Sequence, residues 1–210
     1  MNRLPGTVRQ LIAALRGLLI FTVILGMAYP LVIFVIGQAA FHNHANGSLV
    51  SFHGKIVGSS LLCQEFVNAK GKALPQYFQS RPSNATSGAS NDYGCNPLYS
   101  AASNLGPNNP DLVALIKQRQ KEISLLDNVP VSAIPADAVT ASGSGLDPDI
   151  SPANAAIQVN RVATARHVSP AAIKALVAKY TSSRVIGILG EPVVNVLLLN
   201  IALDQRYPVR

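Results

Sequence analysis

The 210-residue sequence predicts one N-terminal transmembrane helix followed by a single exported domain of mixed α/β (α+β) type. Three observations lead to this fold class. No Asp, Glu, Lys or Arg occurs between Arg16 and Lys55, and the first part of this gap is strongly apolar. Farther along the chain, helix-start signals alternate with short apolar runs that are typical of strands. Hydrophobic residues make up 49% of the chain and charged residues only 13%, which excludes a disordered, highly charged protein.

Residues 17–41 form the predicted transmembrane helix. The run contains 25 residues, of which only three have polar side-chain atoms. At 1.5 Å per residue it spans roughly 37 Å, more than the hydrocarbon core of a bilayer. Pro30 is expected to kink the helix because it lacks a backbone N–H, and Gly26 leaves a small patch where another helix could pack. A lone anchor, in which neither residue matters, stays open as the alternative.

The orientation of this helix follows from the positive charges that flank it. Arg3, Arg9 and Arg16 precede the apolar run, and the next fixed positive charge is Lys55. The positive-inside rule therefore predicts a cytoplasmic basic tail at residues 1–16 and an extracytoplasmic domain at residues 42–210. The expected location is the inner (plasma) membrane, with a single pass. A cleaved signal peptide is the alternative, but its apolar core is about 7–15 residues long.

The net charge of +7 does not indicate a nucleic-acid partner. Three of the 17 basic residues lie in the N-terminal tail, so residues 42–210 hold 14 basic and 10 acidic residues, a net charge of +4. No block of Lys and Arg occurs among them. The excess of positive charge therefore reflects membrane topology in part, and we expect no binding to nucleic acid.

Three helices of the exported domain are predicted by a capping residue followed directly by proline. Such a pair satisfies the first backbone N–H groups and fixes the backbone angle of the first turn. The three starts are Asn109-Pro110, Ser151-Pro152 (a helix through about Arg166) and Ser169-Pro170 (a helix through about Tyr180).

Short apolar runs predict the strands, and a polar stretch predicts loops. Residues 81–110 are rich in Ser, Asn, Gly and Pro and have no helical period, which is typical of long ordered loops. The strands are expected within residues 48–66, in a segment that ends near Val139, and as a buried strand over residues 193–199, followed by a helical turn at residues 200–204.

The two cysteines, Cys63 and Cys95, both lie on the predicted exported side. Disulfides persist in that compartment, so we expect these two residues to pair. Two separate buried thiols remain the alternative.

No complete catalytic or metal-binding motif occurs in the sequence. The phosphate-binding motif that ends in Gly-Lys-Ser/Thr is absent. His42 and His44 could offer two nitrogens to a metal, but no obvious third ligand lies nearby, so no metal site is predicted. The two histidines are instead expected to lie at the membrane boundary.

The segment from Thr140 to Pro152, TASGSGLDPDISP, is the most unusual one. Backbone N–H groups of its Gly and Ser residues could face an anion. Asp147 and Asp149 could hold a cation or a neighbouring chain. The same composition also suits a tight connection between two elements, and that interpretation stays open. The candidates for an anion or nucleotide site are Ser142, Gly143, Ser144 and Gly145.

Several separated motifs, in order along the chain, resemble the C subunit of the Kdp potassium-transporting ATPase. The resemblance covers nearly the whole sequence, although Cys63 and Cys95 lie outside the family pattern. The motifs are Asn46-Gly47-Ser48-Leu49, Tyr77-Phe78 with Arg81-Pro82-Ser83, Ser103-Asn104-Leu105-Gly106, Asn109-Pro110, TASGSGLDPDISP, Gln158 with Arg161-Val162-Ala163 and Ala165-Arg166, Gly190 with Pro192, Val194-Asn195, and Leu199-Asn200 through Asp204.

The resemblance implies a non-catalytic subunit of a high-affinity, ATP-driven potassium importer. Such a subunit assembles with a channel-like potassium-translocating subunit and a P-type ATPase subunit. It stabilises the complex and acts as a catalytic chaperone that raises the ATP affinity of the ATPase subunit. It has no tightly bound cofactor of its own, and ATP is bound through the partner. Gln158 joins the candidates for nucleotide contact, and the expected interface or fold residues are Gly26, Pro30, Arg81, Asn104, Asp147, Asn195 and Asp204.

Two other functions remain open from the residues alone. One is a membrane-anchored exported hydrolase that uses Ser142 or Ser144 as its nucleophile. The other is a nucleotide-binding module built on the Gly-Ser loop. The predicted topology disfavours the second one, because ATP is cytoplasmic and the domain is predicted to lie outside the cell.

Overall fold

The structure, a computed structural model, describes residues 5–209. The chain divides into two compact units, with the boundary after Ser48. Each unit is described by itself. The domain of residues 49–210 combines helices with short strands, in agreement with the predicted mixed class.

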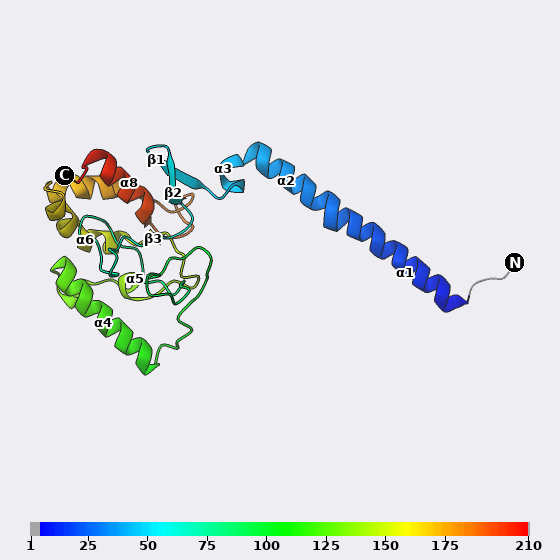
Figure 1. Cartoon of the computed structure of the whole chain (residues 1–210), viewed down its shortest axis with the longest axis horizontal. Coiled ribbons are helices and arrows are strands. Elements are labelled where there is room, and N and C mark those ends of the chain that lie inside the picture. Colours follow the sequence, from blue (N-terminus) through cyan, green and yellow to red (C-terminus); the bar gives the residue numbers. More distant parts are fainter. Residues whose placement is uncertain (1–4, 210) are drawn as a thin grey trace. The chain divides into compact units, whose positions relative to one another are not determined.

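The N-terminal unit is dominated by one apolar helix (Figure 1). It consists of α1 (Gly6–Val23), a π-helical turn η1 (Ile24–Ala28) and α2 (Tyr29–Ala40), and a short helix α3 (His42–Ala45) follows. Within residues 5–209, Gly6–Ala40 is the one helix long and apolar enough to cross a membrane. It starts before residue 17, so Arg9 and Arg16 lie inside α1.

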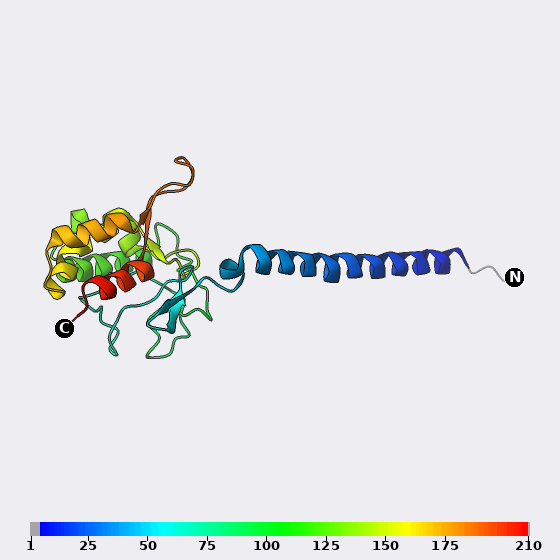
Figure 2. The same ribbon diagram turned by 90° about the horizontal axis from the view of Figure 1, so that it is seen from above.

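The sequence predicts a kink at Pro30, and in the structure the region before this residue forms a π turn. The backbone N–H of Tyr29 donates to the carbonyl of Ile24, five residues earlier. A wider turn makes room for the proline ring and redistributes the hydrogen bonds that Pro30 cannot make. Figure 2 accordingly shows the helix passing through this segment without an abrupt bend.

The domain begins with a hairpin of two antiparallel strands, β1 (Leu49–Phe52) and β2 (Lys55–Ser59). His53 and Gly54 form its two-residue turn, and both have positive φ angles, as a type I′ turn requires. The predicted short strands within residues 48–66 are thus confirmed for residues 49–59, whereas Leu61 and Leu62 lie in a turn.

Three helices begin where the capping residues and prolines predict. They are α4 (Pro110–Asp127), α6 (Pro152–Ala165) and α7 (Pro170–Lys179). At each start the side chain of the preceding residue accepts a backbone hydrogen bond: Asn109 from Asp111 at 2.8 Å, Ser151 from Asn154 at 3.0 Å, and Ser169 from Ala172 at 3.3 Å.

The prediction of a buried strand over residues 193–199 is wrong for its second half. Strand β5 (Val193–Asn195) ends at Asn195, and helix α8 (Val196–Arg206) begins directly after it. The Asn195 side chain accepts a hydrogen bond from the backbone N–H of Leu198 at 3.1 Å, which caps the start of a helix that the following leucines favour. The helical turn expected at residues 200–204 is therefore the interior of α8.

The segment before Val139 is also not a strand. It consists of the 3-10 helix η2 (Val131–Ala133) and the short helix α5 (Ala136–Val139). Pro135 precedes α5 with the extended backbone of a helix start, and Asp137 places a negative charge in the first turn.

The core lies between a small sheet and three helices. Strands β3 (Asp149–Ile150), β5 and β4 (Thr181–Ser182) form an antiparallel sheet in the order β3-β5-β4. Helix α6 packs against α7 and α4, and α7 packs against α8. Figure 1 shows these helices grouped together in the domain. The core side chains include Phe78, Ile150, Val159, Val162, Ile173, Val194, Leu199 and Leu203.

Residues 81–109 form neither helix nor strand in the described chain, as the sequence predicts. Internal bonds fix this segment. Cys63 and Cys95 form a disulfide, with their Cα atoms 5.4 Å apart. The Asp92 carboxylate accepts hydrogen bonds from the backbone and hydroxyl of Ser87 and from Asn96, which together lower the pKa of Asp92 below its usual value.

Candidate functional site

Residues 74–79 contain a turn, in which the Tyr77 N–H donates to the Leu74 carbonyl at 3.2 Å, and side chains from distant helices hold them in place. We call them the clamped segment. Asn200 of α8 donates to the carbonyl of Phe78 and accepts from its N–H, both at 2.9 Å. Gln158 of α6 does the same for Gln79, at 3.2 and 2.7 Å. Two buried amide side chains thus replace the ladder of a β-strand.

Arg161 of α6 holds the first part of the clamped segment. Its guanidinium donates to the carbonyls of Pro75 at 2.9 Å and Tyr77 at 2.8 Å. It also forms an ion pair with Asp127, at 2.7 Å, in which both side chains are almost fully buried. Because every contact of this cation lies inside the fold, Arg161 is a structural residue.

Arg166, also buried, connects the clamped segment to the C-terminal end of α8. It donates to the carbonyls of Gln76 and Tyr207, both at 2.7 Å, and to Asp204 at 2.8 Å. The Tyr77 hydroxyl donates to the second oxygen of Asp204 at 3.0 Å. Burial and the nearby Asp204 raise the pKa of Tyr77. The structure therefore places Asp204 inside the domain framework.

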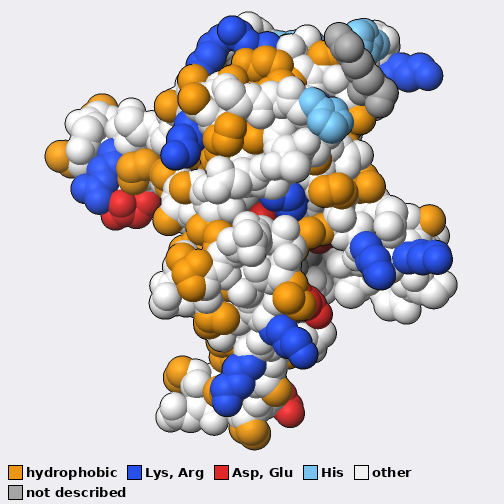
Figure 3. Space-filling model, turned by 90° about the vertical axis from the view of Figure 1, so that its left-hand side faces the viewer, with side chains coloured by type: hydrophobic (Ala, Val, Ile, Leu, Met, Phe, Trp, Pro, Cys, Tyr) orange, Lys and Arg blue, Asp and Glu red, His pale blue; other side chains and the backbone are white. Residues whose placement is uncertain are grey.

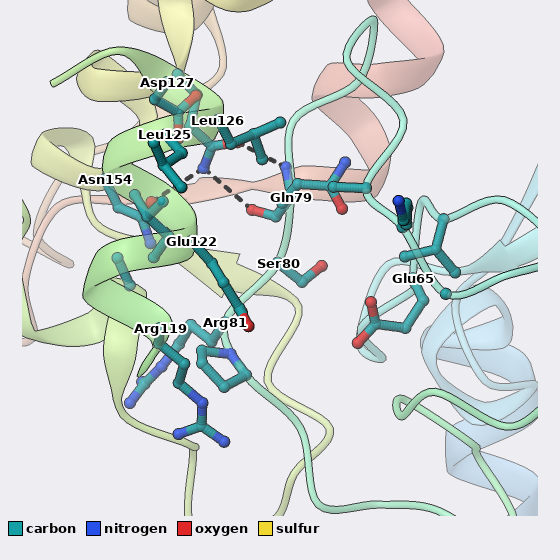
Figure 4. A pocket seen from close by; sticks show the side chains of 18 residues that line it. Glu65, Gln79, Ser80, Arg81, Arg119, Glu122, Leu125, Leu126, Asp127 and Asn154 are labelled. Carbon is teal, nitrogen blue, oxygen red and sulfur yellow. Dashed lines mark hydrogen bonds between the residues drawn. The ribbon is translucent and has the colours of Figure 1, made fainter. Parts of the chain in front are cut away.

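A groove of about 760 Å³ opens between α4 and the chain on either side of the clamped segment. Figure 4 shows Arg119, Glu122, Leu125 and Leu126 of α4 on one wall and Glu65 on the other. Its lining combines apolar side chains with both signs of charge; it also includes Val67, Lys72, Gln79, Arg81, Ile123 and Asn154.

Burial shifts the pKa values of Glu65 and Arg119 in the groove. Desolvation raises the pKa of Glu65 from its usual 4.5 to about 7. Desolvation also lowers the pKa of Arg119, whose guanidinium donates to the carbonyl of Val139 at 2.9 Å. Arg81 pairs with Asp147 at 2.9 Å, and its buried Nε–H has no hydrogen-bond partner within residues 5–209. The groove thus has an apolar wall and, beside it, polar groups that can bind a partner.

Of the charged residues that line the groove, sequence reasoning identified Arg81 and missed Glu65, Lys72, Arg119, Glu122 and Asp127. Glu65 is a single acidic residue among mostly apolar neighbours, and this isolation is the one sequence signal that could have identified it as a site residue. Arg119 follows Leu112, Leu115 and Ile116 at helical spacing, and a charged residue in line with apolar ones was the corresponding signal there. The pair Arg81–Asp147, by contrast, joins two of the residues expected to act in an interface or in the fold.

The loop of residues 142–145 is packed against the segment that contains Ser83 and Ala101. The carbonyl of Gly145 accepts from the Ser83 hydroxyl at 2.6 Å, and that of Ser144 accepts from the N–H of Ala101 at 2.9 Å. A Cβ at position 145 would lie 2.6 Å from the carbonyl oxygen of Ala101. Close backbone approach therefore accounts for Gly145. Ser142 is buried, whereas Gly143 and Ser144 are exposed.

Two of the remaining candidate residues, Asn195 and Gln158, bond within the domain to residues far away in the sequence. Asn195, besides starting α8, donates to Asp149 at 3.1 Å and to the carbonyl of Ser60 at 2.9 Å. Asn104 is exposed and has a positive φ of 52°. Gln158 is committed to the clamped segment rather than to the 142–145 loop.

The described residues contain no metal-binding constellation. Within residues 5–209, no group of three or more His, Cys, Asp or Glu side chains is arranged to hold a metal ion. The His44 ring lies 3.2 Å from the hydroxyl of Ser48.

Gly26 and Pro30, two of the expected interface residues, belong to the apolar helix. Gly26 lies in the π turn and Pro30 just after it.

Comparison with known proteins places nearly the whole chain in one family. Residues 11–205 match the family described as "K+-transporting ATPase, c chain". Proteins named "Potassium-transporting ATPase KdpC subunit" are 49% identical in Sorangium cellulosum (89% of this chain, 93% of the relative), 50% identical in Caulobacter vibrioides (90% and 89%) and 44% identical in Mycobacterium tuberculosis (94% and 98%). The chain therefore belongs to the KdpC family, the C subunits of potassium-transporting ATPases.

Proposed function

We propose that this subunit is non-catalytic, that it stabilises an ATP-driven potassium import complex, and that it raises the affinity of the P-type ATPase subunit for ATP. The observation that carries the proposal is the family match, which covers both the apolar helix and the domain. The partners it requires are a channel-like potassium-translocating subunit and the ATPase subunit. ATP is bound by the ATPase subunit rather than by this chain.

The domain is proposed to lie on the extracytoplasmic side. Arg9 and Arg16 in α1 support this orientation, because no further Lys or Arg occurs before Lys55. ATP is then on the opposite side of the membrane from the domain. Any effect on ATP affinity must act as a coupling free energy transmitted through membrane-spanning helices.

The contacts of the domain favour a docking role over catalysis. Four buried polar side chains, those of Arg161, Arg166, Gln158 and Asn200, hold the clamped segment. A domain braced in this way is rigid and can present fixed surfaces to other subunits. Burial disfavours Ser142 as the nucleophile of a hydrolase, whereas Ser144 is exposed.

The proposal is tested by purifying the complex with and without this chain. We expect the full chain to copurify with both larger subunits from detergent. We also expect the KM for ATP of the ATPase to rise when the chain is omitted, with a smaller change in kcat. An unchanged KM would contradict the chaperone role, and recovery of the chain alone would contradict the subunit role.

The orientation has a separate test. Protease added to sealed, intact cells should digest the domain, whereas protease added to inverted vesicles should leave it intact. The opposite pattern would overturn the proposed topology. As a control against a hydrolase, the double variant Ser142→Ala, Ser144→Ala is expected to support potassium uptake like the wild type.

A further inference from the structure

The loop between β4 and β5 presents large apolar side chains to solvent. Figure 2 shows this orange-brown loop projecting from the rest of the domain. We call residues 185–189 the hairpin tip. Its four large side chains are Val185, Ile186, Ile188 and Leu189, and they are 67%, 79%, 72% and 58% exposed. On the face of the molecule drawn in Figure 3, apolar side chains lie in small patches, several of them beside charged side chains.

The hairpin tip has a defined conformation. Val185 and Leu189 form an antiparallel bridge, in which the Val185 N–H donates to the Leu189 carbonyl at 2.9 Å. Below the bridge, Arg184 Nη2 donates to both carboxylate oxygens of Glu191, at 2.9 and 2.7 Å. The apolar side chains are therefore displayed on a closed turn whose strands lead directly into the sheet of the domain.

Ile186 is in an unfavourable conformation for its residue type. Its φ is 48°, in the left-handed region, and that of Gly187 is 81°. A β-branched residue is strained there, and Gly, Asn or Asp is usual at such turn positions. With 79% of Ile186 exposed, packing within the domain does not compensate for the strain. The stability of the domain thus does not explain the isoleucine at this position. A contact with another molecule explains it.

The composition of the hairpin favours a protein pocket over a lipid surface. Segments that bind at the membrane interface combine apolar residues with several Lys or Arg and with Trp or Tyr. Residues 181–192 contain no aromatic residue, and their only charges, Arg184 and Glu191, neutralise each other. An uncharged apolar knob is complementary to an uncharged apolar pocket of another protein.

We propose that the hairpin tip inserts into an apolar pocket of another subunit of the same potassium-transporting ATPase. The proposal rests on the proposed function, because it requires the assembled complex. Five residues bury far less than the roughly 1,600 Å² of an ordinary stable interface. The hairpin tip is therefore one part of a larger interface between the two subunits.

The first test compares the assembly of the full chain with the stability of its domain. In the double variant Ile186→Asn, Ile188→Asn, asparagine suits the left-handed turn position, so the domain should unfold at the same or a higher urea concentration. Copurification of the larger subunits should nevertheless fall at least tenfold. Opposite changes of this kind distinguish a docking residue from a structural one. The matched control is Leu98→Asn, which alters a leucine that is 86% exposed in the 81–109 segment and should leave assembly unchanged.

The second test identifies the occupant. A photo-activated cross-linking amino acid is incorporated at position 188 of the full chain in its native membrane. The expected adduct is with another subunit of the same ATPase, identified by mass spectrometry. Adducts with phospholipid only or with a second copy of this chain, or the absence of any adduct, would overturn the proposal.

The two proposals fail in different ways. If the wild-type chain does not copurify with the larger subunits, the proposed function fails. If the wild type copurifies and the Ile186→Asn, Ile188→Asn variant copurifies equally well, only the docking role of the hairpin tip is refuted.

Discussion

Replacing Glu65 by glutamine is expected to remove a pH dependence from the stability of the domain. Burial in the groove wall raises the pKa of this carboxyl from 4.5 to about 7. Between these pH values the folded domain holds a proton that the unfolded chain has released. The free energy of unfolding therefore falls as the pH rises from about 4.5 to about 7, and it stays at the lower value above that range.

The size of the effect follows from the shift of the pKa. A tenfold change in proton affinity is worth about 1.4 kcal/mol, so moving the pKa from 4.5 to about 7 costs up to roughly 3 kcal/mol at high pH. The neutral amide of a glutamine side chain has no charge to desolvate. We expect Glu65→Gln to match the wild type near pH 4 and to be up to about 3 kcal/mol more stable near pH 8.

The assay is urea unfolding of the full chain in detergent at a series of pH values. Tyrosine fluorescence is a suitable signal, because the chain has no Trp and all but one of its six Tyr lie in the domain. The matched control is Glu122→Gln, an exposed glutamate on the opposite wall of the groove, which should retain the wild-type pH profile. Equal stability of Glu65→Gln and wild type at pH 8 would refute the reasoning.

Three further predictions concern the framework and the helix. Arg161→Met leaves Asp127 buried without its cation and should lower the free energy of unfolding by roughly 3–5 kcal/mol, as measured in urea. Reducing the disulfide between Cys63 and Cys95, which are 32 residues apart, should cost roughly 3–4 kcal/mol, measured by comparing unfolding with and without a reductant. Pro30→Ala allows an ordinary α-helix in place of the π turn; it should weaken copurification with the larger subunits while the urea midpoint of the domain stays unchanged.

Each of these predictions has a contrary outcome. A loss below about 1 kcal/mol for Arg161→Met would mean that the buried ion pair and the carbonyl contacts are replaceable. Identical unfolding of the oxidised and reduced chains would show that the loop closed by the cysteines is already restricted in the unfolded state. A lowered urea midpoint for Pro30→Ala would show that the helix affects the folding of the domain.

Features with local causes could be predicted from the sequence. The starts of α4, α6 and α7 depend on one capping side chain and the proline after it, so adjacent residues contain the whole signal. The division of residues 193–206 was harder. The same apolar residues are compatible with a strand and with a buried helix. The hydrogen bond from the Leu198 N–H to the Asn195 side chain marks where the helix begins.

The groove and the clamped segment could not be predicted, because long-range contacts create them. Gln158 and Gln79 are 79 residues apart, and Asn200 and Phe78 are 122 apart. Nothing in the neighbourhood of Gln158 shows that its amide pairs with a distant backbone. The motif positions in the resemblance marked Arg81, Asp147 and Asp204, and the structure adds what each one contacts.

Because side chains of α6 and α8 hold the clamped segment, this segment can reach its native structure only after both helices have been synthesised. During synthesis, residues 74–79 emerge well before Arg161, Arg166 and Asn200. Until the last helix is complete, the N–H and carbonyl of Phe78 must bond to water, and pairings over such long separations form slowly. The nascent domain therefore reaches its native state only after α8 has been synthesised, and a chain that stops short of Asn200 lacks the side chain that holds Phe78.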